Sequence, residues 1–234
     1  MGVNLTTKLK FMEAKSNLKR SKILWLWNIL RHGLFLHGLT NRLEKIGIGI
    51  TPYYWAEEGL FGNEPPQIKG DSSAFKSRKL SLEEVNEAGK KIAPENKYEM
   101  VKGFENGQIY LGLVHNGDIA ACMAIELNDF IFNKKSYKLE QNEAYLLNMW
   151  TFNSYRGKNL APYLRYQSYL LLNEMGRTKT YSLSAFFNKS TLKFKKKLKA
   201  KNLKLFIAVN LFNKYHRLLI LRNYHRSKRK GTFI

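Results

Sequence analysis

The sequence lacks most of the side chains that would place it in a common enzyme class. It has one cysteine, Cys122, among 234 residues, so an internal disulfide is excluded and a reducing, cytoplasmic compartment is expected. Cys122 falls in an apolar run and is interpreted as a small buried hydrophobic residue. The five histidines lie on expected loops or near the N-terminus and lack the spacing of a metal site, so no metal is expected.

Acidic residues are missing from the last quarter of the chain. None follows Glu174, whereas 17 of the 40 Lys and Arg residues do, and the net charge is +22. Such a field favours anionic partners: coenzyme A, an anionic membrane surface, nucleic acid or acidic sugar polymers. A solvated basic tail that aids solubility is the alternative. Nucleic acid is disfavoured, because the sequence has no RNP, zinc-finger or helix-turn-helix pattern.

No hydrophobic run is long enough to span a membrane. The most apolar stretch, residues 23–36, is interrupted by Asn28, Arg31 and His32 and has no signal-peptide cleavage pattern. Trp25 and Trp27 lie beside Lys and Arg residues, which suits an amphipathic helix over residues 20–45 at the surface of an anionic membrane. The alternative is a helix that packs on the domain or on a second subunit of an oligomer.

The remaining chain alternates strand and helix patterns. Ser81 followed by Glu84 is a capping box that predicts a helix to about Ile92, where Pro94 stops it. Asn116-Gly117 between two apolar runs predicts a β-hairpin. The other expected elements are a β-rich stretch (46–54), loops (59–79 and 133–142), strands (108–115, 118–127, 144–151, 180–185, 203–211 and 218–221) and two helices (158–175 and the basic 190–199).

The most informative stretch joins a strand to a long helix through the residues Trp150-Thr151-Phe152-Asn153-Ser154-Tyr155-Arg156-Gly157-Lys158-Asn159-Leu160-Ala161. Backbone N–H groups at such a turn point beyond the start of the helix, and the helix dipole favours an anion there. The stretch therefore predicts a phosphate-binding turn. It matches neither the G-x-x-x-x-G-K-[ST] pattern nor the G-x-G-x-x-G pattern of nucleotide sites.

The order of these residues resembles the acetyl-CoA loop of the GNAT acyltransferase superfamily, which runs Arg or Gln, two residues, Gly, one residue, then Gly or Ala. Arg156 and Ala161 fit, and Asn159 replaces the central Gly, which a left-handed backbone tolerates. The stretch 188–200 resembles the family's second signature. Asn188 fits there, whereas Lys195 stands where the family often has a tyrosine acid.

The resemblance covers about residues 78–224 and implies an α/β (α+β) fold, with a mixed, mainly antiparallel sheet flanked by helices and an N-terminal helical extension. Three segments follow: a basic, amphipathic helical segment (1–47), a GNAT-like acyltransferase domain (48–224) and a basic tail (225–234). In that family the strand before the loop separates from the next strand, and the pantetheine arm enters between them. By resemblance, these strands are Asn148–Phe152 and Tyr181–Ala185.

The function implied is an acyl-CoA-dependent N-acyltransferase that moves an acyl group, expected to be acetyl, to an unidentified amine acceptor by direct attack. A non-catalytic GNAT-like or basic protein that binds an anionic membrane or nucleic acid is the alternative. Direct attack requires a base, a donor for the oxyanion and alignment of the reactants. The candidate bases are Glu126 and Glu143, and Tyr145 is the candidate acid. The expected acyl-CoA contacts are Trp150, Thr151, Arg156, Gly157, Lys158, Asn159, Leu160, Ala161, Asn188 and Lys195.

Overall fold

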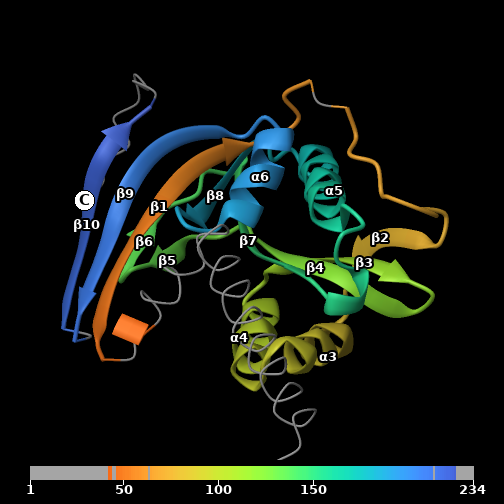
Figure 1. The fold of residues 1–234 in the computed structure, drawn as a ribbon, viewed down its shortest axis with the longest axis horizontal. Helices are drawn as coiled ribbons and strands as arrows, with labels where there is room; N and C mark the ends of the chain where they lie inside the picture. Colours follow the sequence, from red (N-terminus) through yellow and green to blue (C-terminus); the bar gives the residue numbers. More distant parts are fainter. Residues whose placement is uncertain (1–41, 44–45, 63, 213, 225–234) are drawn as a thin grey trace, which may run out of the picture.

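The fold is organised around one continuous sheet with the strand order β10-β9-β1-β8-β7-β4-β3-β2 (Figure 1). It is seen in a computed structural model that describes residues 42–43, 46–62, 64–212 and 214–224. Most of the helix expected over 20–45, and the tail 225–234, lie outside these residues, and the division into three segments stays a prediction. The sheet strands are β1 (Ile48–Glu58), β2 (Phe75–Lys79), β3 (Ile109–His115), β4 (Asp118–Glu126), β7 (Glu143–Thr151), β8 (Lys179–Ala185), β9 (Lys201–Leu211) and β10 (Tyr215–Asn223).

The sheet is mixed and mainly antiparallel, as expected. Only the neighbours β7 and β8 run parallel, and the helix over residues 160–174 forms the crossover between them. The first strand, β1, does not lie at an edge, because it inserts between β8 and β9 and pairs antiparallel with both. The Asn116-Gly117 turn is confirmed: both residues have positive φ angles, of 50° and 89°, as a tight hairpin turn requires.

Helices cover the two faces of the sheet. On one face lie α3 (Leu82–Ile92) and α4 (Pro94–Glu105), and on the other lie α5 (Leu160–Glu174) and α6 (Lys189–Lys197) (Figure 1). The capping box that begins α3 is present, with Ser81 and Glu84 bonded reciprocally. Strands β3 and β4 are buried by both helical layers, and Cys122 is buried on β4 as expected. Within the described residues, no helix combines the length and apolarity that crossing a bilayer would take.

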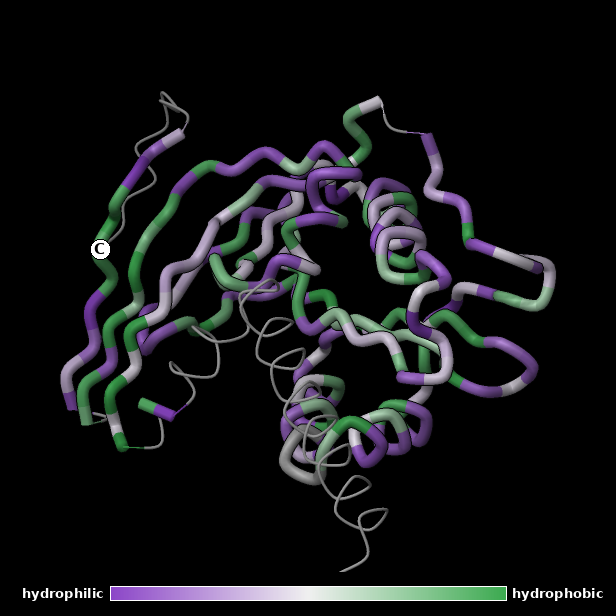
Figure 2. Tube along the Cα trace, viewed as in Figure 1, coloured by the Kyte–Doolittle hydropathy of each residue, from purple (hydrophilic) through white to green (hydrophobic). Residues whose placement is uncertain are grey.

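A short hairpin of β5 (Phe130–Phe132) and β6 (Lys135–Tyr137) covers β1 on the face opposite to α5 and α6. It is held by aromatic contacts, with ring centroids 5.4 Å apart for Tyr53 and Phe132 and 5.9 Å apart for Trp55 and Tyr137. This face is called the hairpin face below, and the opposite one the α5 face. Figure 2 shows the hydrophobic residues that gather along the neighbouring β9.

Two expectations about local structure are wrong, and one helix, α4, was not expected. Residues 75–79 form strand β2 rather than part of a loop, because they pair with β3. Pro94 ends α3 but also begins α4, since a proline at the first helical position needs no N–H partner. Residues 135–137 form β6 within the expected polar loop, and its pairing with β5 involves too few residues to leave a periodic pattern.

Candidate functional site

The parallel strands β7 and β8 pair only at their beginnings. The register runs from Glu143 opposite Lys179 to Leu146 opposite Ser182 and then stops, although β7 continues to Thr151 and β8 to Ala185. A bulge in β7 accompanies the change: Asn148 has a φ of 41°, and the register with β4 shifts there. Because a bulge bends its strand and re-aims backbone groups, β7 turns away from β8. The ends of the two strands that do not pair with each other, residues 147–151 and 183–185, are called the β7–β8 separation below.

Polar groups lie along this separation on both faces of β8. On the α5 face, the Ser184 hydroxyl is buried, and no partner for it is recorded among the described residues. On the hairpin face, the backbone of Leu183 contacts the Tyr145 hydroxyl, and burial raises the pKa of Tyr145 well above its usual value. Burial without a partner is costly for a hydroxyl, so Ser184 is suited to bond a molecule between the strands.

The turn between β7 and α5, with the first residues of the helix (156–161), is called the phosphate turn below, after its predicted role. It holds its backbone in left-handed conformations at two positions. Gly157 has a φ of 84°, and Asn159, the residue before the helix, has a φ of 65° and a ψ of 24°. The Asn159 amide fixes the turn by donating to the Gln67 carbonyl oxygen (2.7 Å) and accepting from the Lys197 ammonium group (3.2 Å). A third tie joins the Lys69 N–H group to the Lys158 carbonyl oxygen (2.9 Å).

The N-terminus of α5 presents free donors above this turn. No acceptor within the described residues is recorded for the N–H groups of Gly157, Leu160 and Ala161, and Pro162 at the third helical position has no N–H group. Unsatisfied N–H groups and the helix dipole favour an anion at this place. The sequence-predicted turn residues are thus together in space, and their contact with acyl-CoA stays a prediction.

Three cations surround the helix start. Arg156 lies over the Trp150 ring, 5.9 Å from its centroid, and its Nε donates to the Thr151 carbonyl oxygen (3.2 Å). Lys158 lies 5.7 Å from the Tyr155 ring centroid, and Lys197 completes the set through its bond to the Asn159 side chain. Trp150, Thr151, Arg156 and Lys158 therefore form one surface with the turn, and it carries positive charge.

The two other predicted cofactor residues lie on α6 and at its start. Asn188 is the N-cap of α6, and its side chain accepts from the Thr191 N–H group (3.1 Å). Lys195 is buried: its ammonium group forms an ion pair with Glu58 (3.1 Å) and donates to the Ser182 hydroxyl (2.5 Å). Because Ser182 is the last residue of β8 that pairs with β7, Lys195 lies beside the beginning of the β7–β8 separation.

Glu58 is the centre of a buried charge cluster that sequence reasoning missed. Its carboxylate also contacts Arg165 Nε (3.3 Å) and accepts from the Tyr169 hydroxyl (2.6 Å) and from Ser182. Burial raises the pKa of Glu58, but the charges of Arg165 and Lys195 and these hydrogen bonds outweigh it and lower the pKa to about 2. One anion balances two cations here. The only sequence signal was Arg165 within the apolar run of the α5 helix.

The two predicted bases lie away from the open part of the separation. Glu143 is at the closed end of the β7–β8 pair, where its carboxylate accepts from Tyr181 (3.1 Å) and from the Glu140 N–H group (3.2 Å). Glu126 ends β4, one strand beyond β7, and Gln108 and the N–H groups of residues 127 and 128 donate to it. Tyr145, opposite Tyr181 on the parallel pair, borders the separation. Among the described residues, no cluster of three metal-ligating side chains is found.

Comparison of the chain with known proteins identifies the fold. No protein-family model and no curated protein sequence matches it. Among solved structures, a GNAT-family acetyltransferase from Colwellia psychrerythraea matches with a TM-score of 0.52 at 11% identity over 70% of this chain and 58% of that one. The glucosamine N-acetyltransferase region of a fungal multi-domain β-N-acetylglucosaminidase matches with a TM-score of 0.53 at 13% identity over 75% of this chain and 23% of that one.

These matches show that the chain has the GNAT acetyltransferase fold, as the sequence motifs led us to expect. The chain spans less than two thirds of the length of each of these two proteins. At these identities the likeness concerns the fold alone.

Proposed function

We propose that the protein is an acyl-CoA-dependent N-acyltransferase. The observation that carries the proposal is the direct connection of two features. Parallel strands separate after Leu146 and Ser182, and the end of β7 is followed by a helix N-terminus whose N–H groups have no acceptor among the described residues. A molecule with a diphosphate at one end and a thin polar arm fits both features at once. The anionic groups match the turn cations and the helix dipole, and the arm meets unpaired strand edges.

The reaction needs only groups that this arrangement offers. The acceptor nitrogen forms a bond to the thioester carbonyl carbon, the carbon–sulfur bond breaks, and the nitrogen's proton leaves as the thiolate gains one. A strand N–H group can donate to the carbonyl oxygen as negative charge develops there. The separated strands hold the two reactants in line, which supplies much of the rate enhancement. No covalent bond to the protein is required.

For the deprotonating group we retain the carboxylates Glu143 and Glu126, with Tyr145 as the proton donor. Glu143 is the better placed of the two, because it belongs to β7 itself and bonds Tyr181, the neighbour of Tyr145 in the parallel pair. Glu126 is separated from β8 by the width of β7. Lys195 has the place that the family gives to a tyrosine, and its bond to Ser182 puts a proton-bearing nitrogen next to the separation.

Calorimetric titration with acetyl-CoA and with coenzyme A tests the proposal. Acetyl-CoA and coenzyme A are expected to bind, and binding raises the melting temperature by mass action. Gly157→Val is expected to lower the affinity at least about tenfold, since a β-branched residue is strained at this positive φ. Gly117→Val is the matched control: its φ is 89°, but it lies in the β3–β4 turn, so it costs stability without affecting affinity.

The outcomes separate the proposal from its alternative. Binding that Gly157→Val weakens and Gly117→Val spares supports the phosphate turn, and turnover with an amine then supports the enzyme. Binding without turnover of any amine in a broad panel favours a non-catalytic GNAT-like protein. Absence of binding by the wild-type chain contradicts the proposal.

A further inference from the structure

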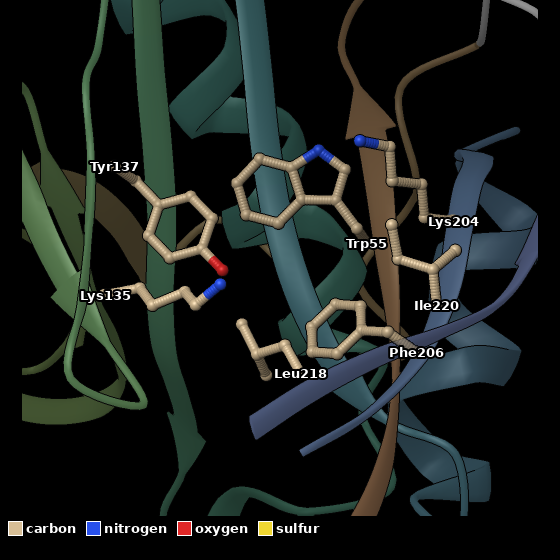
Figure 3. Close-up of a pocket in the computed structure, with 7 residues that line it drawn as sticks. All are labelled: Trp55, Lys135, Tyr137, Lys204, Phe206, Leu218 and Ile220. Carbon is tan, nitrogen blue, oxygen red and sulfur yellow. The ribbon is translucent and has the colours of Figure 1, made fainter. Parts of the chain in front are cut away.

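An apolar hollow lies on the hairpin face of the sheet, away from the phosphate turn. It is enclosed between the β5–β6 hairpin and strands β1, β9 and β10, and it has about 470 Å³ of empty volume including its open mouth. Figure 3 shows the side chains that line it: Trp55, Lys135, Tyr137, Lys204, Phe206, Leu218 and Ile220.

The strand register places the hollow level with the β7–β8 separation. Trp55 lies opposite Leu183 on β8, the first residue of β8 that no longer pairs with β7, and opposite Lys204 on β9. The Trp55 ring also contacts the Tyr181 and Tyr145 rings, with centroids 5.4 Å and 5.8 Å apart. Only β8 and this aromatic layer therefore lie between the hollow and the point where the strands separate.

The lining has a definite charge pattern. It has five apolar or aromatic side chains, two lysines and no acidic residue. Lys135 comes from the hairpin and Lys204 from β9, and Figure 3 shows them on opposite sides of the hollow. Leu218 and Ile220 of β10 lie between them with partly exposed side chains. Both lysines repel a cationic ligand here, whereas an anionic group near a lysine gains an interaction that a partly buried site strengthens.

We propose that this hollow binds the acceptor of the transfer reaction, and that the acceptor is an amine with an apolar body and an anionic group. The identification of the ligand as an acceptor rests on the proposed function, whereas the binding of an apolar anion in the hollow does not. The apolar body packs against Trp55, Phe206 and Leu218, the anionic group bonds Lys135 or Lys204, and the amine extends across Leu183 toward the separation. The selective feature is the charge of the ligand rather than its hydrogen-bonding pattern.

Binding is measured without any turnover. The probe is 8-anilinonaphthalene-1-sulfonate, an apolar anion whose fluorescence rises in apolar sites, and the competitors are octanoate, octylamine and 1-octanol. Octanoate is expected to displace the probe at a concentration at least about tenfold lower than octylamine, because one charge-assisted contact is worth that factor. Equal displacement by octylamine would overturn the charge assignment.

Two variants of one strand localise the site. Leu218→Glu puts a carboxylate into the hollow and is expected to weaken octanoate binding at least about tenfold. Leu219→Glu makes the same change on the neighbouring residue of β10, which is 53% exposed and does not line the hollow, and is expected to have no effect. Lys204→Met and Lys135→Met should reduce the octanoate preference, with the exposed Lys214→Met as their control. Equal loss in both leucine variants would place the probe elsewhere and overturn the proposal.

Transfer then distinguishes this proposal from the proposed function. With acetyl-CoA as donor, 8-aminooctanoate is expected to be acetylated faster than octylamine, and octylamine faster than 1,8-diaminooctane. If acetyl-CoA does not bind but octanoate binds in the hollow, the proposed function fails and the hollow survives as an anion site. If acetyl-CoA binds and diaminooctane is the best acceptor, the hollow is not the acceptor site.

Discussion

Replacing Glu58 with Gln is expected to cost the fold about 3 kcal/mol at neutral pH. The carboxylate is buried with Arg165 and Lys195 as its partners, so the substitution leaves two cations without an anion. Its pKa, about 2 in the fold against a usual 4.5, gives the size: a difference of about 2.5 pKa units corresponds to about 3 kcal/mol. Removing one partner of a buried ion pair costs a similar amount in other proteins.

The pH dependence has a definite sign. A carboxyl group whose pKa is lowered by folding stabilises the fold fully above its unfolded pKa. That stabilisation is lost as the pH falls through the folded value. The difference in unfolding free energy between the wild type and Glu58→Gln is therefore expected to be constant above about pH 5.5. It should shrink as the pH falls from 4.5 toward 2.

Urea denaturation followed by circular dichroism between pH 3 and pH 7 measures this difference. Glu57→Gln is the matched control, since Glu57 is the neighbouring strand residue and points to the other face of the sheet. Glu58→Gln with Lys195→Met is expected to be more stable than the sum of the single changes predicts, because the cation is removed with the anion. A loss below about 1 kcal/mol, or one equal to that of Glu57→Gln, would refute the reasoning.

Two further predictions concern catalysis and membranes. Loss of the base is expected to slow transfer by about 10²–10⁴-fold with unchanged coenzyme A affinity. The variants Glu143→Gln and Glu126→Gln test this in an assay that measures the release of the coenzyme A thiol. Full activity in both variants rejects a carboxylate base. The chain is expected to float with anionic but not neutral vesicles at low salt. Addition of 0.5 M NaCl should release it, because the Debye length is already down to about 10 Å at 0.1 M salt and surface charges are screened further at higher salt. Binding to neither vesicle type would contradict a peripheral membrane contact.

Much of the fold was predictable where the signals were local. The capping box at Ser81, the Asn116-Gly117 turn and the strand, turn and helix order around Arg156 each depend on a few neighbouring residues, and the structure has all three. The helix end before Pro94 was predicted correctly, but the helix that Pro94 begins was not, because proline is compatible with both the end of one helix and the start of another. The strand β2 was missed because it is short and mostly exposed, so it carries no alternating pattern.

The candidate site was predictable only in part. The phosphate turn is contiguous in sequence, so its residues could be named together. The Glu58 cluster and the hollow could not, because each collects residues from strands and helices that meet only through tertiary packing. Lys195 illustrates the limit: on sequence it is one of several lysines in a basic helix, and only packing shows that it is buried against Glu58.

The insertion of β1 between β8 and β9 accounts for both the Glu58 cluster and the apolar hollow. Side chains alternate along a strand, so β1 sends Glu58 to the α5 face and Trp55 to the hairpin face. Glu58 holds Ser182 and Lys195 where the β7–β8 pairing ends, and Trp55 forms the wall of the hollow opposite Leu183. One strand thus borders the separation from both sides of the sheet. A register slip of one residue would exchange the two faces, placing the indole in the charge cluster and the carboxylate in the hollow. The pairing of β1 with β8 and β9 on both of its edges opposes that slip.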